Sequence, residues 1–143
     1  MDFALPGMDT KTLSEEGVEM VVRRIGSDEP LIGKDGTTVK IKLLGPDSTK
    51  YRALSRAQVR KRLSRMAAAG TPADSDDYAA EDEASTLSVL AACTVDWTGI
   101  MTTKGEAIPC TPETALALYT GFPAIRDQVD YFMAQRGNFT KAS

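Results

Sequence analysis

The sequence predicts an α+β fold: an N-terminal antiparallel β-ribbon, a basic amphipathic helix, and then a C-terminal all-helical half of about three helices. Two segments near the N-terminus alternate apolar and polar residues, and a long cationic segment with helical spacing follows them. Cap residues then mark the bounds of further helix-length segments. We therefore divide the chain into an α+β half at residues 1–70, an acidic linker at 71–83 and a helical half at 84–143.

The predicted ribbon consists of strands near residues 18–25 and 37–44. Their apolar residues occupy alternate positions: Val18, Met20 and Val22 in the first strand, and Val39, Ile41 and Leu43 in the second. This period of two is typical of half-buried strands. The connecting segment is rich in turn-forming residues and ends in Asp35-Gly36, which favours an antiparallel pair. Residues 1–16 are polar, and we expect no regular structure there.

The basic helix is predicted over residues 48–69, where Asp47 or Ser48 can accept hydrogen bonds from the first helical amides. Its apolar residues are expected close to one face: Tyr51, Leu54, Val59, Leu63 and Met66. Its seven cations are Lys50, Arg52, Arg56, Arg60, Lys61, Arg62 and Arg65, and it contains no acidic residue. Like charges spaced four residues apart destabilise a helix. We therefore expect a counter-charge nearby, which the acidic segment at 71–83 can supply.

The helical half begins within the acidic segment, because acidic residues suit the positive end of a helix dipole. Its first helix is expected to end near Thr94. A second helix is predicted over residues 112–120, with Thr111 as its N-cap and a proline at the first helical position. A third is predicted over residues 124–136. We expect Phe139 to pack back against these helices.

Residues 96–113, DWTGIMTTKGEAIPCTPE, contain the only tryptophan of the chain. We interpret this segment as a joint of turns between helices, with Trp97 as a core anchor that locks the corner. The alternative is that Trp97 is exposed at a partner-binding surface, since tryptophan is enriched in binding hot spots. A catalytic role is not expected, because the segment offers no base, paired nucleophile or set of metal ligands.

The composition excludes several kinds of site. The chain has 143 residues, no histidine, and two cysteines at Cys93 and Cys110, so neither a Cys-His nucleophile pair nor a usual zinc site can form. No phosphate-binding loop is present, and no segment has the pattern of a membrane helix or a signal peptide. We therefore expect a protein that is not an enzyme and has no cofactor, metal or membrane contact. Both cysteines are interpreted as small buried side chains.

Charge is distributed unevenly along the chain. Residues 1–70 carry a net charge of +4 and residues 71–143 carry −7, which together give the net charge of −3. This asymmetry favours either self-association or one basic contact face. The basic helix could neutralise phosphates of a nucleic acid. However, the isoelectric point near 5.0 disfavours nucleic-acid binding, so contact of the basic helix with the chain's own acidic segment or with an acidic protein is preferred.

Several motifs occur in a characteristic order along about residues 17–140. These motifs are LLGPDSTKY (43–51), the basic helix, the acidic segment, WTGI (97–100), a Lys-Gly turn, IPCTPETA (108–115), LY (118–119), FPAIRDQV (122–129) and NF (138–139). This order resembles small proteins that tailed bacteriophages and prophages encode among their tail genes. Such proteins are considered tail assembly chaperones.

The resemblance implies a binding function. A chaperone of this family binds the tape measure protein, a long and largely helical protein that otherwise aggregates, and can help to recruit tail tube protein. It acts in the host cell cytoplasm during assembly and is usually absent from the finished virion. The alternative is a structural minor tail or neck protein of the virion. A nucleic-acid-binding protein is the less favoured third interpretation.

We select nine residues for partner binding. An apolar helical surface beside separated charge suits the binding of a partner helix in a groove. The apolar contact is assigned to Trp97, Ile100, Leu118, Tyr119, Phe122 and Ile125. Electrostatic steering is assigned to Arg52, Arg56 and Arg60 of the basic helix.

Overall fold

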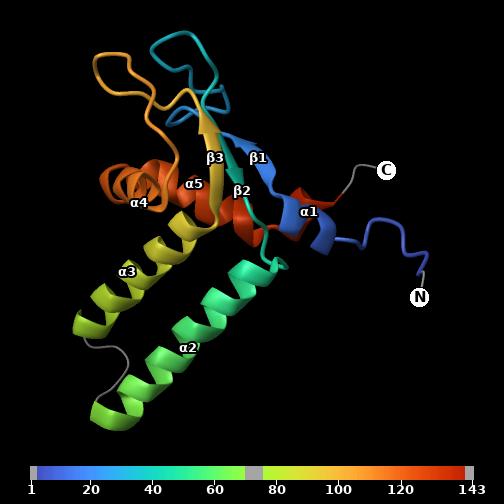
Figure 1. Ribbon diagram of the computed structural model, residues 1–143, viewed down its shortest axis with the longest axis vertical. Coiled ribbons are helices and arrows are strands. Elements are labelled where there is room, and N and C mark those ends of the chain that lie inside the picture. The colour runs from blue at the N-terminus through green and yellow to red at the C-terminus, as the bar shows by residue number, and fades with distance from the viewer. Residues whose placement is uncertain (1–2, 70–75, 141–143) are drawn as a thin grey trace.

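The computed structural model describes residues 3–69 and 76–140. It has an α+β architecture in which helices cover one face of a three-stranded antiparallel sheet and two long helices project from the body (Figure 1). In chain order the elements are α1 (Lys11–Glu16), β1 (Val18–Val21), β2 (Lys40–Leu43), α2 (Thr49–Ala69), α3 (Asp76–Ala92), β3 (Thr94–Thr98), α4 (Pro112–Gly121), α5 (Pro123–Ala134) and the 3₁₀ helix η1 (Arg136–Phe139).

The sheet has the strand order β1-β2-β3. Ile41 of β2 pairs with Met20 on one side and with Trp97 on the other, and all three residues are buried. The adjacent row lies on the opposite face, because successive side chains of a strand alternate. That row carries alternating charge and consists of Glu19, Lys42 and Asp96. One face of the sheet is therefore apolar and the other is polar.

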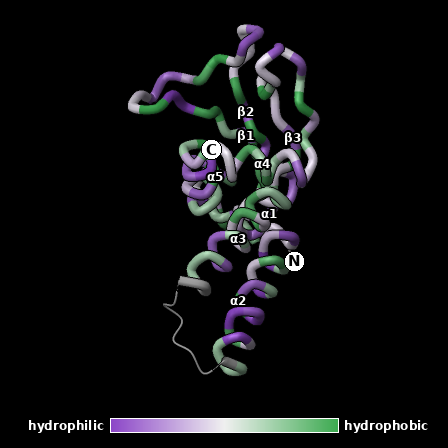
Figure 2. The backbone as a smooth tube through the Cα atoms, turned by 90° about the vertical axis from the view of Figure 1, so that its left-hand side faces the viewer, coloured by the Kyte–Doolittle hydropathy of each residue, from purple (hydrophilic) through white to green (hydrophobic). Residues whose placement is uncertain are grey.

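The core lies between the apolar face of the sheet and the helices α4 and α5, which lie behind the sheet in Figure 1. α4 contributes Tyr119 and α5 contributes Val129 and Met133, and each of these side chains is at least 98% buried. Leu90 near the end of α3 belongs to the same cluster. In contrast, α2 is mostly hydrophilic along the part that projects from the body (Figure 2).

The C-terminal half is not all helical, because residues 94–98 form β3. Trp97 therefore lies in a strand and not in a joint of turns between helices. The interpretation of Trp97 as a core anchor is confirmed: it is 9% exposed, and its Nε1 donates a hydrogen bond to the carbonyl oxygen of Ile108 at 2.7 Å. Only Cys93 separates α3 from β3, so no glycine or proline marks the change from helix to strand.

The two predicted strands pair in antiparallel fashion, but they belong to a three-stranded sheet and are shorter than expected. β1 ends at Val21 instead of residue 25, and β2 covers residues 40–43 instead of 37–44. In the described segment that connects them, regular pairing gives way to isolated bridges, which join Arg23 to Pro30 and Ile32 to Thr38. Proline has no amide hydrogen to donate, which limits regular pairing at that point.

The N-terminal segment is not devoid of regular structure, because it contains α1. The side-chain Oδ1 of Asp9 accepts hydrogen bonds from the amides of Lys11 and Thr12, each at 3.1 Å. Gly17 follows the last helical residue with a φ of 93°, a conformation that favours glycine. Both signals are visible in the sequence, but six residues are too few to show a helical period.

The predicted helix caps are confirmed. Ser48 Oγ accepts a hydrogen bond from the Tyr51 amide at 3.1 Å at the start of α2. At the start of α4, the side chains and amides of Thr111 and Thr114 exchange hydrogen bonds of 3.1 and 2.9 Å. Phe139 is fully buried against Phe132 with the ring centroids 5.6 Å apart, which confirms that this residue packs back.

The helices α2 and α3 together form a projecting unit, which we call the arm (Figure 1). Residues 70–75 between them lie outside the described residues, as does that part of the predicted acidic linker. From Asp76 onward the acidic segment is helical and forms the start of α3. The end of this helix at Ala92 lies close to the predicted end near residue 94.

Candidate partner-binding surfaces

The sequence predicted that the apolar residues of α2 lie close to one face, but the structure divides them between two faces. Tyr51 and Leu54 pack against the core, whereas Val59 and Leu63 are 48% and 59% exposed. Nine residues separate Leu54 from Leu63, which places them about 180° apart around a helix of 3.6 residues per turn. α2 thus has an inner face toward α3 and an exposed outer face.

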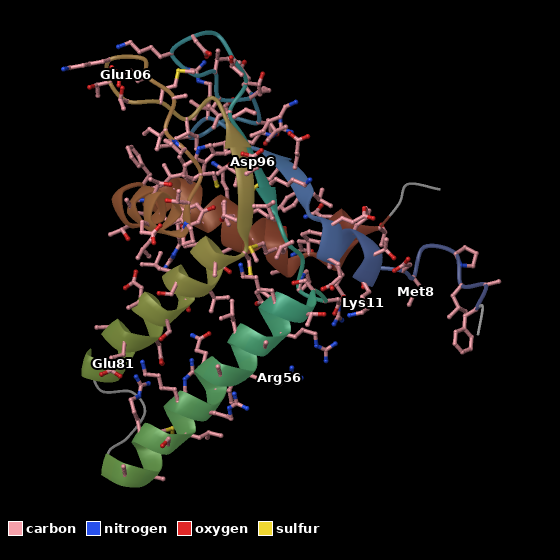
Figure 3. The ribbon with its side chains drawn as sticks, viewed as in Figure 1. Met8, Lys11, Arg56, Glu81, Asp96 and Glu106 are labelled. Carbon is pink, nitrogen blue, oxygen red and sulfur yellow. The ribbon has the colours of Figure 1, made fainter. Side chains whose placement is uncertain are left out.

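Ion pairs join the inner face of α2 to α3. Arg65 pairs with Glu81 and with Asp82, the second at 3.0 Å between Nη2 and Oδ1. Arg62 also approaches Asp82, with 3.4 Å between Nε and Oδ2. Figure 3 places Glu81 near the start of α3, away from the body. The acidic segment therefore does supply counter-charge to the basic helix, but to Arg62 and Arg65 and not, within the described residues, to the arginines spaced four apart that prompted the prediction.

The outer face of α2 carries the three arginines that the sequence singled out. Arg52, Arg56 and Arg60 are exposed, and none of them forms an ion pair with a residue in the described parts of the chain. Figure 3 shows Arg56 midway along the helix. Helical spacing places all three beside the exposed side chains of Val59 and Leu63. We call these five residues the outer face of α2.

The six apolar residues selected for partner contact do not form one surface. Trp97 and Tyr119 are buried core residues, and Ile100 and Leu118 are half-buried against the same core. The hydroxyl oxygen of Tyr119 lies 2.6 Å from Thr94 Oγ1. Burial is the main cause that raises the pKa of Tyr119 to about 12. This tyrosine is therefore a neutral, structural residue inside the protein.

Phe122 and Ile125 do come together, at the junction of α4 and α5. Phe122 is 59% exposed, and the two side chains line an apolar pocket of about 290 Å³. The same pocket is lined by Ile25 and Leu31 from the segment that follows β1. We call it the α4–α5 pocket. Sequence reasoning missed Ile25 and Leu31, although Ile25 is a large apolar residue directly before a glycine turn.

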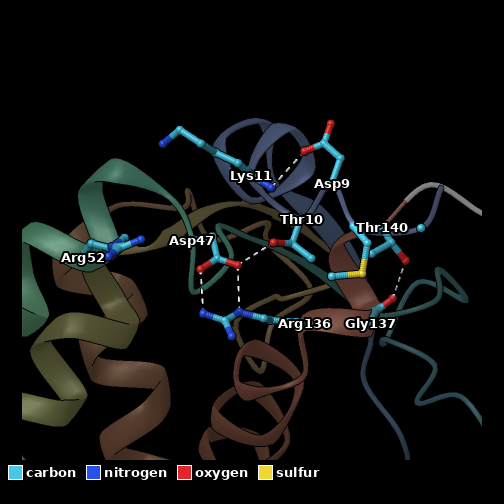
Figure 4. Close-up of a pocket in the computed structure, with 10 residues that line it drawn as sticks. Asp9, Thr10, Lys11, Asp47, Arg52, Arg136, Gly137 and Thr140 are labelled. Atoms are coloured by element: carbon cyan, nitrogen blue, oxygen red, sulfur yellow. Dashed lines mark hydrogen bonds and ion pairs between the residues drawn. The ribbon is translucent and has the colours of Figure 1, made fainter. Parts of the chain in front are cut away.

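A polar pocket of about 590 Å³ lies between the N-terminal segment, the start of α2 and η1 (Figure 4). Asp47 accepts hydrogen bonds from Arg136 Nε at 2.9 Å and Nη2 at 3.0 Å, and a third from Thr10 Oγ1 at 2.5 Å. The hydrogen bonds from Arg136 are the largest cause that holds the pKa of Asp47 below its ordinary value. This cluster ties both ends of the chain to the start of α2, and its partners are too distant in sequence to be predicted.

The cysteines do not form a reactive site. Cys93 is buried, which confirms its interpretation, and burial raises the pKa of its thiol to about 11. Cys110 is half-buried, and burial raises its pKa as well. Both thiols are therefore protonated, and weak nucleophiles, near neutral pH. Within residues 3–69 and 76–140, no three Cys, Asp or Glu side chains are grouped so that they could hold a metal ion.

In the parts of the chain that the structure covers, no helix has the length and apolar character needed to cross a membrane. No protein-family model matches the chain, and no curated protein or solved structure is significantly similar to it.

Proposed function

We propose that the protein is a non-enzymatic tail assembly chaperone that binds a tape measure protein through the outer face of α2. The observation that carries the proposal is the presence of two exposed apolar residues on a projecting helix, beside three arginines that form no ion pair with the residues the structure describes. The order of sequence motifs supplies the class of partner. A long helical partner with apolar stripes is the kind of protein that such a face can bind.

The apolar part of this contact is the pair Val59 and Leu63. They are spaced four residues apart and therefore lie one turn apart on the same side of the helix. Exposed apolar residues on adjacent turns suit the apolar stripe of a second helix, and burying them removes apolar area from water. The resulting contact orients the partner helix along α2.

The arginines supply the charge complementarity. Arg52 and Arg60 are about 12 Å apart along the helix axis, at 1.5 Å per residue. In the free chain their mutual repulsion weakens α2 slightly. Acidic residues on the bound helix would relieve that repulsion and accelerate association. The segment that the chaperone recognises is therefore an amphipathic helix with acidic residues on the flank of its apolar stripe.

The proposal is tested by co-expression with the tape measure protein of the same genome, followed by affinity capture and size-exclusion chromatography. We expect the tape measure protein to become soluble and to co-elute with this chain. The variant Arg56→Glu/Arg60→Glu should lose the complex, because two attractive contacts become repulsive. The control Lys34→Glu/Lys104→Glu has the same charge change on exposed loops outside the arm and should retain it.

Three results would contradict the proposal. If the tape measure protein stays insoluble and this chain forms a stoichiometric band in purified particles, the structural tail or neck assignment replaces it. If the chain binds DNA with an affinity that falls steeply with salt, and the arginine variant abolishes only that binding, the nucleic-acid assignment replaces it. If the arginine variant and the lysine control capture equal amounts of the tape measure protein, the outer face of α2 is not part of the contact.

A further inference from the structure

The α4–α5 pocket is a preformed apolar site that the proposed chaperone contact does not use. Ile25 and Phe122 flank it with 87% and 59% of their surface exposed. Gln128 holds the two walls together, because its Oε1 accepts from the Arg23 amide at 2.8 Å and its Nε2 donates to the Arg23 carbonyl oxygen at 2.9 Å. The side of the pocket formed by the segment after β1 is thus fixed to α5 before any ligand binds.

The N-terminal segment was expected to be polar, but its residues 3–8 are apolar and expose their three large side chains. Phe3, Leu5 and Met8 are 76%, 63% and 71% exposed. The segment leads away from the sheet (Figure 1). A turn in which the Met8 amide donates to the Leu5 carbonyl oxygen at 3.1 Å gives it a defined shape.

The pocket and the N-terminal segment are attached to opposite ends of α5. The pocket is at the first residues of this helix, around Pro123. The N-terminal segment leaves the molecule at Thr10, whose side chain shares Asp47 with Arg136, just after the last residue of the helix. α5 has 12 residues and is therefore about 18 Å long. The chain from Phe3 to Asp9 spans at most about 20 Å when fully extended.

This separation decides which molecule supplies the ligand. To reach the pocket of its own molecule, the segment would have to lose its turn and run fully extended along the whole of α5. A segment from a second molecule can reach the pocket without becoming extended, so its turn can be kept. Charge agrees with this pairing, since Arg23 and Arg24 lie at the pocket, Arg24 in an exposed ion pair with Glu29, and Asp2 and Asp9 flank the apolar segment in the sequence.

We infer that residues 3–8 of one copy of the chain bind in the α4–α5 pocket of a second copy. This assigns Phe122 and Ile125, two residues selected for partner binding, to contact between copies. The contact joins two different surfaces, so it is heterologous, and repetition produces a ring or an open chain of copies. The inference is independent of the tape measure proposal, because it uses neither the outer face of α2 nor that partner.

Sedimentation velocity of the full chain over a range of concentrations tests the inference. We expect the average mass of the wild-type protein to rise with concentration. The segment variant Phe3→Ser/Leu5→Ser and the pocket variant Ile25→Ser/Phe122→Ser should each remain monomeric, with self-association weakened at least about tenfold. The control Leu116→Ser/Tyr131→Ser removes two other exposed apolar residues and should associate as the wild type does.

Mixing the two defective variants gives the decisive result. The segment variant keeps an intact pocket, and the pocket variant keeps an intact segment, so an equimolar mixture should form dimers and stop there. A labelled peptide of residues 3–10 should also bind the segment variant and not the pocket variant. A wild-type protein that is monomeric throughout, or a mixture that stays monomeric while the peptide fails to bind the correctly folded segment variant, would overturn the inference.

Discussion

Gly45 precedes α2 and packs against Ser14 of α1 and Phe139 of η1. A Cβ atom built at this position would lie 2.2 Å from Ser14 Oγ and 2.7 Å from the ring of Phe139. We expect Gly45→Ala to destabilise the protein by about 1–3 kcal/mol, because both neighbours are buried and must shift. Urea unfolding followed by circular dichroism measures the change.

Gly121→Ala is the matched control. A Cβ atom at Gly121 meets nothing within 4 Å, and its φ does not require glycine. This substitution should leave stability unchanged or raise it by about 0.5 kcal/mol. Equal stability of the two variants would mean that the packing around Phe139 is looser than the structure has it.

Asp47 makes stability depend on pH. The pKa of an aspartate is about 3.9 in an unfolded chain, and hydrogen bonds, chiefly from Arg136, lower it in the folded protein. The stabilisation from Asp47 is therefore complete above about pH 4 and is lost as the pH falls through the lower pKa of the folded state. Asp47→Asn should cost about 1 kcal/mol at pH 7, since Arg136 is largely exposed.

Urea unfolding at pH 7 and at pH 3 compares the two states of this carboxyl group. The difference in stability between the wild type and Asp47→Asn should shrink at the lower pH, because the unfolded wild-type chain then binds a proton at this carboxyl group, which favours unfolding. The exposed Asp130 serves as the control site, and Asp130→Asn should produce a smaller effect at pH 7. A constant difference across this range would show that Asp47 stabilises the fold by packing alone.

At the scale of elements, the sequence predicted those whose signals are local. The caps at Ser48 and Thr111 bond to amides three residues away, so residue types alone identify them. β3 has no such signal, because only Trp97 of its five residues is buried and no apolar alternation results. Its conformation follows from pairing with β2, about 50 residues earlier. Long-range pairing of this kind is invisible to a reading of local pattern.

The candidate site could also be predicted only in part, because some of its features depend on contacts between segments distant in sequence. A helical period placed Arg52, Arg56 and Arg60 on one side of the basic helix, and they do share its outer face. Helical spacing alone could not show that this side of the helix, with Val59 and Leu63, stays exposed, because that depends on which face α3 covers. The wall that Ile25 adds to the α4–α5 pocket comes from a loop about 100 residues before Phe122.

The arginine row on α2 gives a prediction about the stability of that helix. Arg56→Glu replaces two repulsive pairs at i±4 with two attractive ones, so we expect stability to rise by about 0.5 kcal/mol at low salt. The gain should diminish at 1 M salt, where exposed charges are screened. Thermal unfolding at both salt concentrations provides the measurement. Arg62→Glu is the control and should destabilise the protein, since Arg62 pairs with Asp82.

At the scale of the whole molecule, the sheet unites segments from both sides of residues 70–75. β1 and β2 precede that segment, and β3 and the covering helices α4 and α5 follow it. The buried cluster contains Ile41 and Leu43 from the first part and Trp97, Tyr119 and Val129 from the second. Neither part holds a complete core, because the strands of the first part lack the helices that cover their apolar face.

This arrangement predicts how the protein behaves when the chain is divided. Fragments of residues 1–70 and 71–143 should each lack a cooperative unfolding transition, because each leaves half of the core in water. Mixed in equal amounts, they should restore one transition, at a lower temperature and dependent on concentration, since association replaces the chain connection. Circular dichroism during heating of each fragment alone and of the mixture tests both expectations. If either fragment unfolds cooperatively alone, the halves are separate domains and β2–β3 pairing joins two preformed units.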